Sequence, residues 1–104
     1  MRIVEFRRMF DDKNAARVRF LVERDRVTEF VVQLECFIEG KWIPIVRYDT
    51  AHGFAHRDLM RPARSPVKKE MQVKDFNEGL TFALKDLAAN WEKYRERYEQ
   101  WLNS

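Results

Sequence analysis

The only two histidines of the chain, His52 and His56, lie four residues apart in one polar segment that runs from Arg47 to Asp58. An imidazole transfers protons near neutral pH, a guanidinium binds phosphate, and a carboxylate orients both groups. The side chains of this segment that we take as candidate catalytic residues are Arg47, Tyr48, Asp49, His52, His56 and Arg57. This composition predicts a small site that handles phosphate.

Read as a nuclease site, the segment needs no metal ion. One imidazole would remove the proton from an RNA 2′-hydroxyl, while the other imidazole or Tyr48 would protonate the leaving oxygen. Arg47 and Arg57 would stabilise the negative charge on phosphorus. Alternation along a strand places Tyr48 on the face opposite Arg47, so these groups converge only if the strand ends near Asp49.

Two other interpretations of the histidine segment remain open. Asp49, His52, His56 and Asp58 offer two nitrogens and two oxygens to a zinc ion, since the histidine spacing is compatible with one metal. The segment has neither a cysteine pair nor a helical framework, and we predict no metal and no other cofactor. The third interpretation is structural: His52 forms a polar turn, and an aspartate pairs with an arginine to hold two strand ends together.

The positive charge of the chain is concentrated beside the histidines. The net charge is +3, yet residues 51–74 carry six basic against two acidic side chains, and the remainder carries 14 against 15. The candidate nucleic-acid-binding residues are Arg57, Arg61, Arg64, Lys68 and Lys69. Such a segment attracts RNA or an acidic peptide, or it is only a solvated loop.

Hydrophobic alternation predicts that these residues are carried by a sheet in a single domain, residues 1–104. The expected strands are Val4 to Phe10, Arg17 to Glu23, Phe30 to Ile38, Trp42 to Asp49, Ala55 to Arg61 and, as a last short strand, Lys68 to Val73. Pro44 cannot donate a ladder hydrogen bond, which predicts a sheet edge or a bulge there. Residues 61–66 contain two prolines and are expected to form a loop.

A long C-terminal helix follows, with Asp75 as its N-cap and Glu78 completing a capping box. Its apolar stripe consists of Leu80, Leu84, Leu87, Trp91, Tyr94, Tyr98 and Trp101. The stripe either packs across the sheet or forms a coiled-coil seam. A helix of about 40 Å is longer than a small sheet is wide, so Tyr94, Tyr98 and Trp101 are expected to overhang it. Overhanging aromatics predict an interface, with a homodimer as the simplest form.

The fold expected from these elements is α+β, an antiparallel sheet of about five strands in residues 1–73 packed against one long helix over 75–103. Cys36 is the only cysteine, which excludes an internal disulfide. No apolar run forms a signal peptide or reaches the length of a membrane span, and we expect a soluble cytoplasmic protein that does not bind membranes. Glycine-rich phosphate loops, nucleophile elbows and zinc-protease helices are absent.

Three stretches of the sequence together resemble a family of small uncharacterised prokaryotic proteins. They are Val46 to Leu59, Asp75 to Leu80 and Asn90 to Tyr98. The Arg-Tyr-Asp-x-Ala-His core is also similar, more loosely, to the Arg-Trp-Asp-x-Ala-Pro-His core of TumE-like toxins from type II toxin-antitoxin systems, with Arg47, Asp49 and His52 at matching positions. Those toxins carry a further His-His-x-His cluster, where this chain has only His56. This second resemblance implies an activity directed at RNA or nucleotides.

Two functions follow from the sequence. The first is a toxin-like RNA-directed effector, with a metal-independent ribonuclease as its enzymatic form. The alternative is a non-enzymatic protein-interaction module, in which the basic segment and the helix aromatics bind a cognate antitoxin, another small protein or a second copy of the chain. The position of the two imidazoles discriminates between them, because an enzyme needs both at one cavity.

Overall fold

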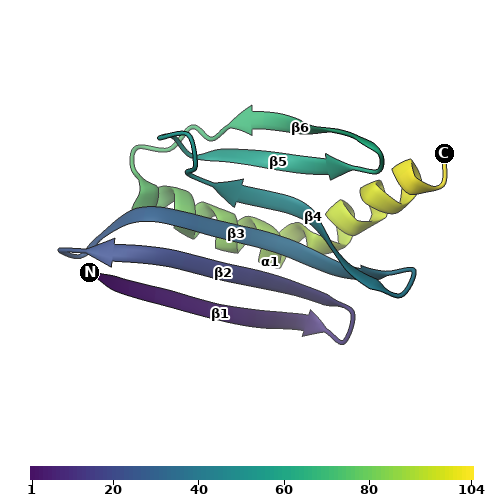
Figure 1. Ribbon diagram of the computed structural model, residues 1–104, viewed down its shortest axis with the longest axis horizontal. Coiled ribbons are helices and arrows are strands. Elements are labelled where there is room, and N and C mark those ends of the chain that lie inside the picture. The colour runs from purple at the N-terminus through teal and green to yellow at the C-terminus, as the bar shows by residue number, and fades with distance from the viewer.

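The computed structural model describes all 104 residues as one six-stranded antiparallel sheet and one helix (Figure 1). The elements are β1 (Arg2–Asp11), β2 (Asn14–Glu23), β3 (Arg26–Ile38), β4 (Lys41–Asp49), β5 (His56–Arg61), β6 (Arg64–Glu70) and α1 (Phe76–Leu102). Every strand pairs with its neighbours in the sequence, so the spatial order is β1 to β6. The predicted α+β fold is confirmed, with six strands where about five were expected.

Tight turns join the strands and fix their registers. Arg24 and Asp25 form the two-residue turn between β2 and β3, and both have positive φ angles, 52° and 64°. Glu39 and Gly40 do the same between β3 and β4, with φ angles of 52° and 79°. Two residues with positive φ match the right-handed twist of the flanking strands. The registers of the central hairpins are therefore set locally.

Pro44 lies at a β-bulge, as the sequence predicted. Leu34 of β3 pairs with Val46 of β4, whereas the next β3 residue, Glu35, pairs with Pro44. Ile45 is therefore the extra residue on β4. Strand β5 pairs with β4 only from Val46 to Asp49, so Pro44 faces no strand on that side.

The two-proline segment differs from its prediction. Arg61 pairs with Arg64 around a turn at Pro62 and Ala63, and residues 64–70 form the edge strand β6 instead of a loop. Pro66 is tolerated there because an edge strand has one unpaired side. The expected strand at Lys68 to Val73 is accordingly displaced toward the N-terminus, and residues 71–75 connect β6 to the helix.

Helix α1 packs along one face of the sheet, against β3, β4 and β5 (Figure 1). As predicted, the Asp75 side chain caps it by accepting from the Glu78 N–H at 2.8 Å. Glu78 in turn accepts from the Lys74 N–H at 3.1 Å, one residue earlier than an ordinary capping box. No helix is both long and apolar enough to cross a membrane.

The expectation that the distal aromatics overhang the sheet is wrong. Tyr98 is only 8% exposed and belongs to the core, and Tyr94 and Trp101 are half-buried against it. The 13 residues of β3 extend for about 43 Å, which matches the length of about 40 Å for the 27-residue helix. The three residues predicted as an interface thus pack inward within one chain.

Candidate functional site

Strands β4 and β5 divide the predicted catalytic residues between the two faces of the sheet. Asp49 pairs with His56, and both side chains lie on the face that carries no helix, which we call the open face. Tyr48 pairs with Arg57, and both point toward α1. The expected convergence of all six residues fails because β4 continues as a regular strand to Asp49.

Asp49 is the centre of a charged group on the open face. Its Oδ1 lies 3.1 Å from His56 Nε2 and accepts from the Ala51 N–H at 3.1 Å, and its Oδ2 lies 3.0 Å from Arg47 Nε. In a neutral imidazole, an Nε2 that faces a carboxylate carries the proton, which leaves Nδ1 with its lone pair. The contact with Asp49 orients the His56 ring.

Asp58 and Lys68 extend this group toward the sheet edge. Asp58 Oδ1 lies 3.8 Å from His56 Nε2, and Asp58 Oδ2 accepts from Lys68 Nζ at 3.3 Å. We call Arg47, Asp49, His56, Asp58 and Lys68 the open-face cluster. Asp49, His56 and Asp58 are 5%, 5% and 7% exposed although no helix covers them. Alternating charges compensate the burial of the two carboxylates.

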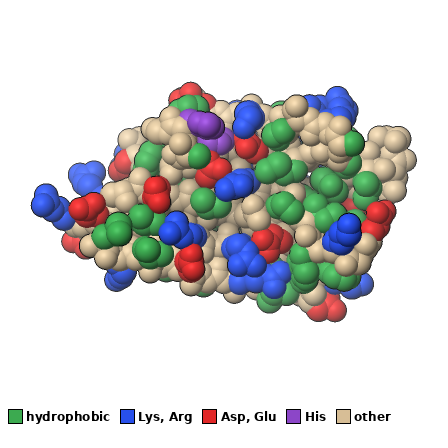
Figure 2. Space-filling view, in the orientation of Figure 1, with side chains coloured by type: hydrophobic (Ala, Val, Ile, Leu, Met, Phe, Trp, Pro, Cys, Tyr) green, Lys and Arg blue, Asp and Glu red, His purple; other side chains and the backbone are tan.

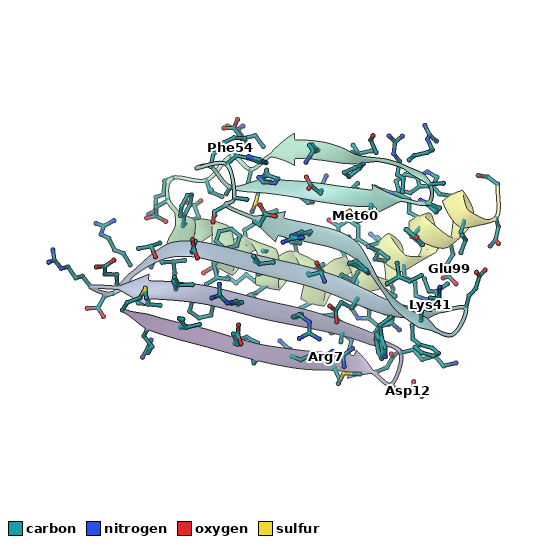
Figure 3. The ribbon with its side chains drawn as sticks, viewed as in Figure 1. Arg7, Asp12, Lys41, Phe54, Met60 and Glu99 are labelled. Atoms are coloured by element: carbon teal, nitrogen blue, oxygen red, sulfur yellow. The ribbon has the colours of Figure 1, made fainter.

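The loop between β4 and β5 covers the cluster in place of a helix. The His52 and Phe54 rings each lie 5.6 Å from the His56 ring, centroid to centroid. Gly53 makes this possible with a φ of 86°, and its N–H donates to Thr50 O at 3.0 Å. Figure 3 shows Phe54 at this loop, and Figure 2 shows the histidines as one patch on the open face. His56 Nδ1 is buried beneath the loop without a hydrogen-bond partner.

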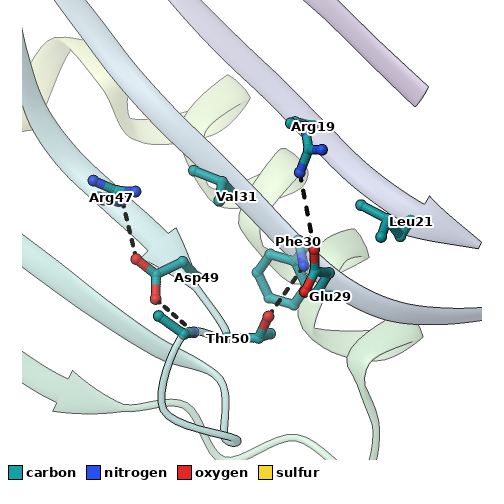
Figure 4. A pocket seen from close by; sticks show the side chains of 9 residues that line it. Arg19, Leu21, Glu29, Phe30, Val31, Arg47, Asp49 and Thr50 are labelled. Carbon is teal, nitrogen blue, oxygen red and sulfur yellow. Dashed lines mark hydrogen bonds and ion pairs between the residues drawn. The ribbon is translucent and has the colours of Figure 1, made fainter. Parts of the chain in front are cut away.

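Two pockets flank the cluster. One contains both imidazoles and two lysines, and its lining residues are His52, Phe54, His56, Lys68, Lys69 and Glu70. The other lies on the far side of Asp49, where Arg19 and Arg47 face the carboxylates of Glu29 and Asp49 (Figure 4). Lys69, for which the structure shows no ion pair, lines only the first of these two pockets, together with the two histidines. We therefore place the candidate site there.

The opposite face of the same strands holds a second polar group, which we call the helix-face network. The Tyr48 hydroxyl donates to Asp86 Oδ2, and the Tyr94 hydroxyl donates to the same oxygen at 2.5 Å. Asn90 Nδ2 donates to Asp86 Oδ1 at 2.8 Å, and Arg57 Nη1 donates to the Tyr94 hydroxyl at 3.3 Å. Burial, reinforced by the hydrogen bonds to Asp86, raises the pKa of Tyr48 and of Tyr94 above their ordinary value. These phenols hold their protons in a packed interior and are poorly suited to donate them to a substrate.

A family model described as a domain of unknown function, DUF7718, matches residues 1–104, the whole chain. The chain belongs to the DUF7718 family. No curated protein and no solved structure matches it significantly. Any function of this DUF7718 domain must therefore be argued from its own geometry.

The basic residues predicted to bind RNA do not form one surface of the DUF7718 domain. Arg57 and Lys69 pair across β5 and β6 on the helix side, whereas Lys68 lies on the open side beside Asp58. Arg61 Nε donates to Ser65 O at 2.7 Å at the end of the hairpin, where Arg61 pairs with Arg64. Of these five residues, only Lys68 and Lys69 line the pocket that holds the histidines, and they approach it from opposite sides of the edge strand β6.

No group of three or more His, Cys, Asp or Glu side chains is placed to share one metal ion. Asp58 joins the histidines as a neighbour of His56 rather than as one of four ligands. Asp86 was missed, although an acid between Leu84 and Leu87 on an apolar stripe signals a buried partner. Lys68 was predicted only as an RNA contact.

Proposed function

We propose that the protein is a toxin-like RNA-directed effector whose site is the pocket formed by the two histidines and by Lys68 and Lys69. The observation that carries this proposal is the separation of the two imidazole rings, 5.6 Å, in a pocket that Lys68 and Lys69 also line. Two imidazoles at one phosphodiester supply a base and an acid in the same step. This arrangement supports a metal-independent ribonuclease.

The proton transfers follow from the contacts of each histidine. Asp49 holds the proton of His56 on Nε2, so Nδ1 is the lone pair that accepts the proton of an RNA 2′-hydroxyl. The 2′-oxygen then bonds to phosphorus, and the bond from phosphorus to the 5′-oxygen breaks. His52, in its protonated form, gives its proton to that oxygen. The products are a 2′,3′-cyclic phosphate and a free 5′-hydroxyl.

Substrate binding requires movement of the loop, because His56 is only 5% exposed. Residues 51–54 are exposed, and Gly53 supplies backbone freedom within them. Displacement of the Phe54 ring would open a path to His56 Nδ1. Lys68, on the open side, would take the phosphate-binding role expected of Arg57 by exchanging its contact with Asp58 for the phosphate, since the helix-face network holds Arg57 on the other side of the sheet.

RNA cleavage in the presence of a chelator tests the proposal. We expect the wild type to leave cyclic phosphate ends, and we expect His52→Ala and His56→Ala to lower the rate by about 100-fold or more each. Arg97→Ala, an exposed change on α1, is the matched control. Expression should arrest growth, and His52→Ala should relieve the arrest. Full cleavage by the His52→Ala protein would exclude this mechanism.

The second candidate is the protein-interaction module, and the closed loop favours it. In the closed form, the open-face cluster pairs its charges internally, and His52, Phe54 and Lys69 are left at the surface. A partner with an acidic segment, such as a cognate antitoxin, would suit this surface. RNA binding that is absent even at low salt, together with tight binding to an acidic partner, would support this candidate over the first.

A further inference from the structure

The two edge strands of the sheet differ in how open they are to pairing. Strand β6 has seven residues and carries Pro66, which removes a backbone donor and discourages pairing with another chain. Strand β1 has ten residues and no proline, and its charged residues, Arg2, Glu5, Arg7, Arg8 and Asp11, are of both signs. Its free side presents backbone donors and acceptors along with exposed apolar side chains: Ile3, Phe6 and Met9 are 50%, 43% and 47% exposed. The β1 edge is therefore the open one.

One antiparallel register brings together complementary residues at the centre of β1, while it places Val4 opposite Arg8 and Arg2 opposite Phe10. When two copies are placed about a two-fold axis through Phe6, the two Phe6 rings meet, and Glu5 of each copy lies opposite Arg7 of the other. Ile3 of each copy lies opposite Met9 of the other. Aromatic, apolar and opposite-charge pairs across neighbouring strands each stabilise a sheet.

We propose that the β1 edge binds a second copy of this chain, with antiparallel β1 strands paired about a two-fold axis at Phe6. The two sheets then form one continuous sheet. Residues opposite each other in this register have the same parity, so both helices lie on the same face. The contact is isologous and closes as a dimer, which leaves each β6 edge free. This inference does not depend on the proposed ribonuclease.

Neighbouring registers lack this complementarity. A shift of the axis to residue 5 places the two Glu5 carboxylates opposite each other, and a shift to residue 7 does the same with the two Arg7 side chains. Like charges directly opposite each other destabilise a sheet. An axis that passes between residues 5 and 6 pairs Phe6 with Glu5, and an axis between residues 6 and 7 pairs it with Arg7. Either position also places the two helices on opposite faces of the joined sheet. The Phe6 axis is therefore the favoured register.

Glu5 and Arg7 each have one oppositely charged partner within the chain, and Arg7 also lies over the Trp42 ring, 4.2 Å from its centroid. Arg7 lies directly opposite Arg17 of β2, and both depend on the single carboxylate of Glu35, at 3.6 and 3.0 Å. Glu5 of the second copy would give Arg7 another carboxylate on its free side (Figure 3 shows Arg7 on β1). Glu5 pairs with Arg19 at 2.8 Å and remains largely exposed.

Disulfide trapping tests the contact and its register. Cys36, the only native cysteine, is fully buried, so background oxidation is low. Phe6→Cys should form a disulfide-linked dimer, because the two positions face each other within reach of a disulfide. Phe54→Cys, at an equally exposed position (43%), is the matched control. Cross-linking inside a preformed dimer should exceed collisional cross-linking of the control by about 100-fold in rate.

A mixing experiment fixes the register independently. Ile3→Cys and Met9→Cys proteins should not cross-link alone, since each position lies about six residues, or roughly 20 Å, from its own copy. Their mixture should cross-link. The wild type should also sediment as a dimer at tens of micromolar. A monomeric wild type, or a Phe6→Cys protein that oxidises no faster than Phe54→Cys, would overturn the proposal. Cross-linking of Glu5→Cys in preference to Phe6→Cys would overturn the register.

Discussion

The two faces of β4 and β5 carry similar residues in very different surroundings. On one face, Tyr48 and Arg57 meet Asp86 and Tyr94 beneath a helix. On the other face, Asp49 and His56 meet under a short loop. A single run of polar sequence therefore supplies a polar network beneath the helix and a charged cluster beneath a short loop. The alternation of side chains along each strand alone decides which residue lies on the helix face and which on the open face.

The cover over each face decides how much its polar groups contribute to stability. Helix α1 removes water from Tyr48, which is fully buried, and Asp86 supplies its acceptor. On the open face, Arg47 retains access to water because 43% of its side chain is exposed, and Asp58 stands beside His56 as an alternative partner. Removing one contact lowers stability less when the remaining polar group can bind another partner or water. We expect the helix face to dominate stability.

Raising the pH should have the largest effect, and it should act on the helix face. Burial raises the pKa of Cys36 from 9.0 to about 12, and it also raises the pKa of Tyr48 and Tyr94. The unfolded chain releases these protons at lower pH than the folded chain. Stability is therefore fully present below about pH 9 and falls as the pH rises toward 12. We expect a loss of about 4 kcal/mol by pH 11, measured by urea unfolding.

Cys36→Ala is the control for this pH dependence. The substitution should lower the free energy of unfolding by about 1 kcal/mol at pH 7. It should also make the loss of that free energy between pH 9 and pH 11 smaller by about 2 kcal/mol. Stability that is constant between pH 9 and pH 11 in the wild type would contradict the assignment of these three groups to a closed interior.

Asp86→Ala should lower the free energy of unfolding by about 3 kcal/mol, because the fully buried phenol of Tyr48 and the half-buried phenol of Tyr94 lose their acceptor. Lys85→Ala, the exposed neighbour on α1, should change it by less than about 0.5 kcal/mol. Chemical denaturation of both variants gives the comparison. Equal stabilities would mean that the helix-face network does not hold α1 on the sheet.

Asp49→Ala should lower the free energy of unfolding by about 1 kcal/mol, which is less than the loss expected for Asp86→Ala. Asp49 also has three polar partners, but two of them have alternatives. Arg47 can turn to water and His56 can turn to Asp58. Asp49→Asn keeps an acceptor and should cost less still. A loss for Asp49→Ala as large as that of Asp86→Ala would remove the distinction between the two faces.

His52→Ala should have the smallest effect on stability, within about 0.5 kcal/mol, because His52 is exposed and makes no hydrogen bond through its side chain. The melting temperature of the variant checks this. A large decrease would show that His52 supports the loop, and loss of activity in that variant would then no longer identify an acid.

The sequence predicted most of the fold because its signals are local. Alternating residues and positive-φ turns define the hairpins, Asp75 caps the helix, and Pro44 marks the bulge. The alternation rule also predicted that Tyr48 would lie on the face of the sheet opposite Arg47. Edge strand β6 was less clear, since the tolerance of Pro66 depends on having no neighbour on one side.

The remaining features depend on distances that the sequence does not contain. The inward packing of Tyr98 follows from the direction of α1, which runs along β3 from Val27, beside Asn77, to Phe37, beside Arg95. The partnership of Tyr48 with Asp86 joins residues 38 positions apart, and that of Arg95 with Asn14 joins residues 81 positions apart. No local pattern specifies such pairs. The cover that the loop places over His56 likewise depends on tertiary packing.

The order of the strands in the sheet has a consequence for folding kinetics. Each strand pairs with the next one along the chain, so the sheet forms by successive hairpins with little loop-closure entropy. Helix docking is different, because Arg95 must find Asn14 and the carbonyl of Phe37 at the far ends of the finished strands. We expect docking of α1 to limit the refolding rate, and until that step an assembled sheet would expose one apolar face to solvent.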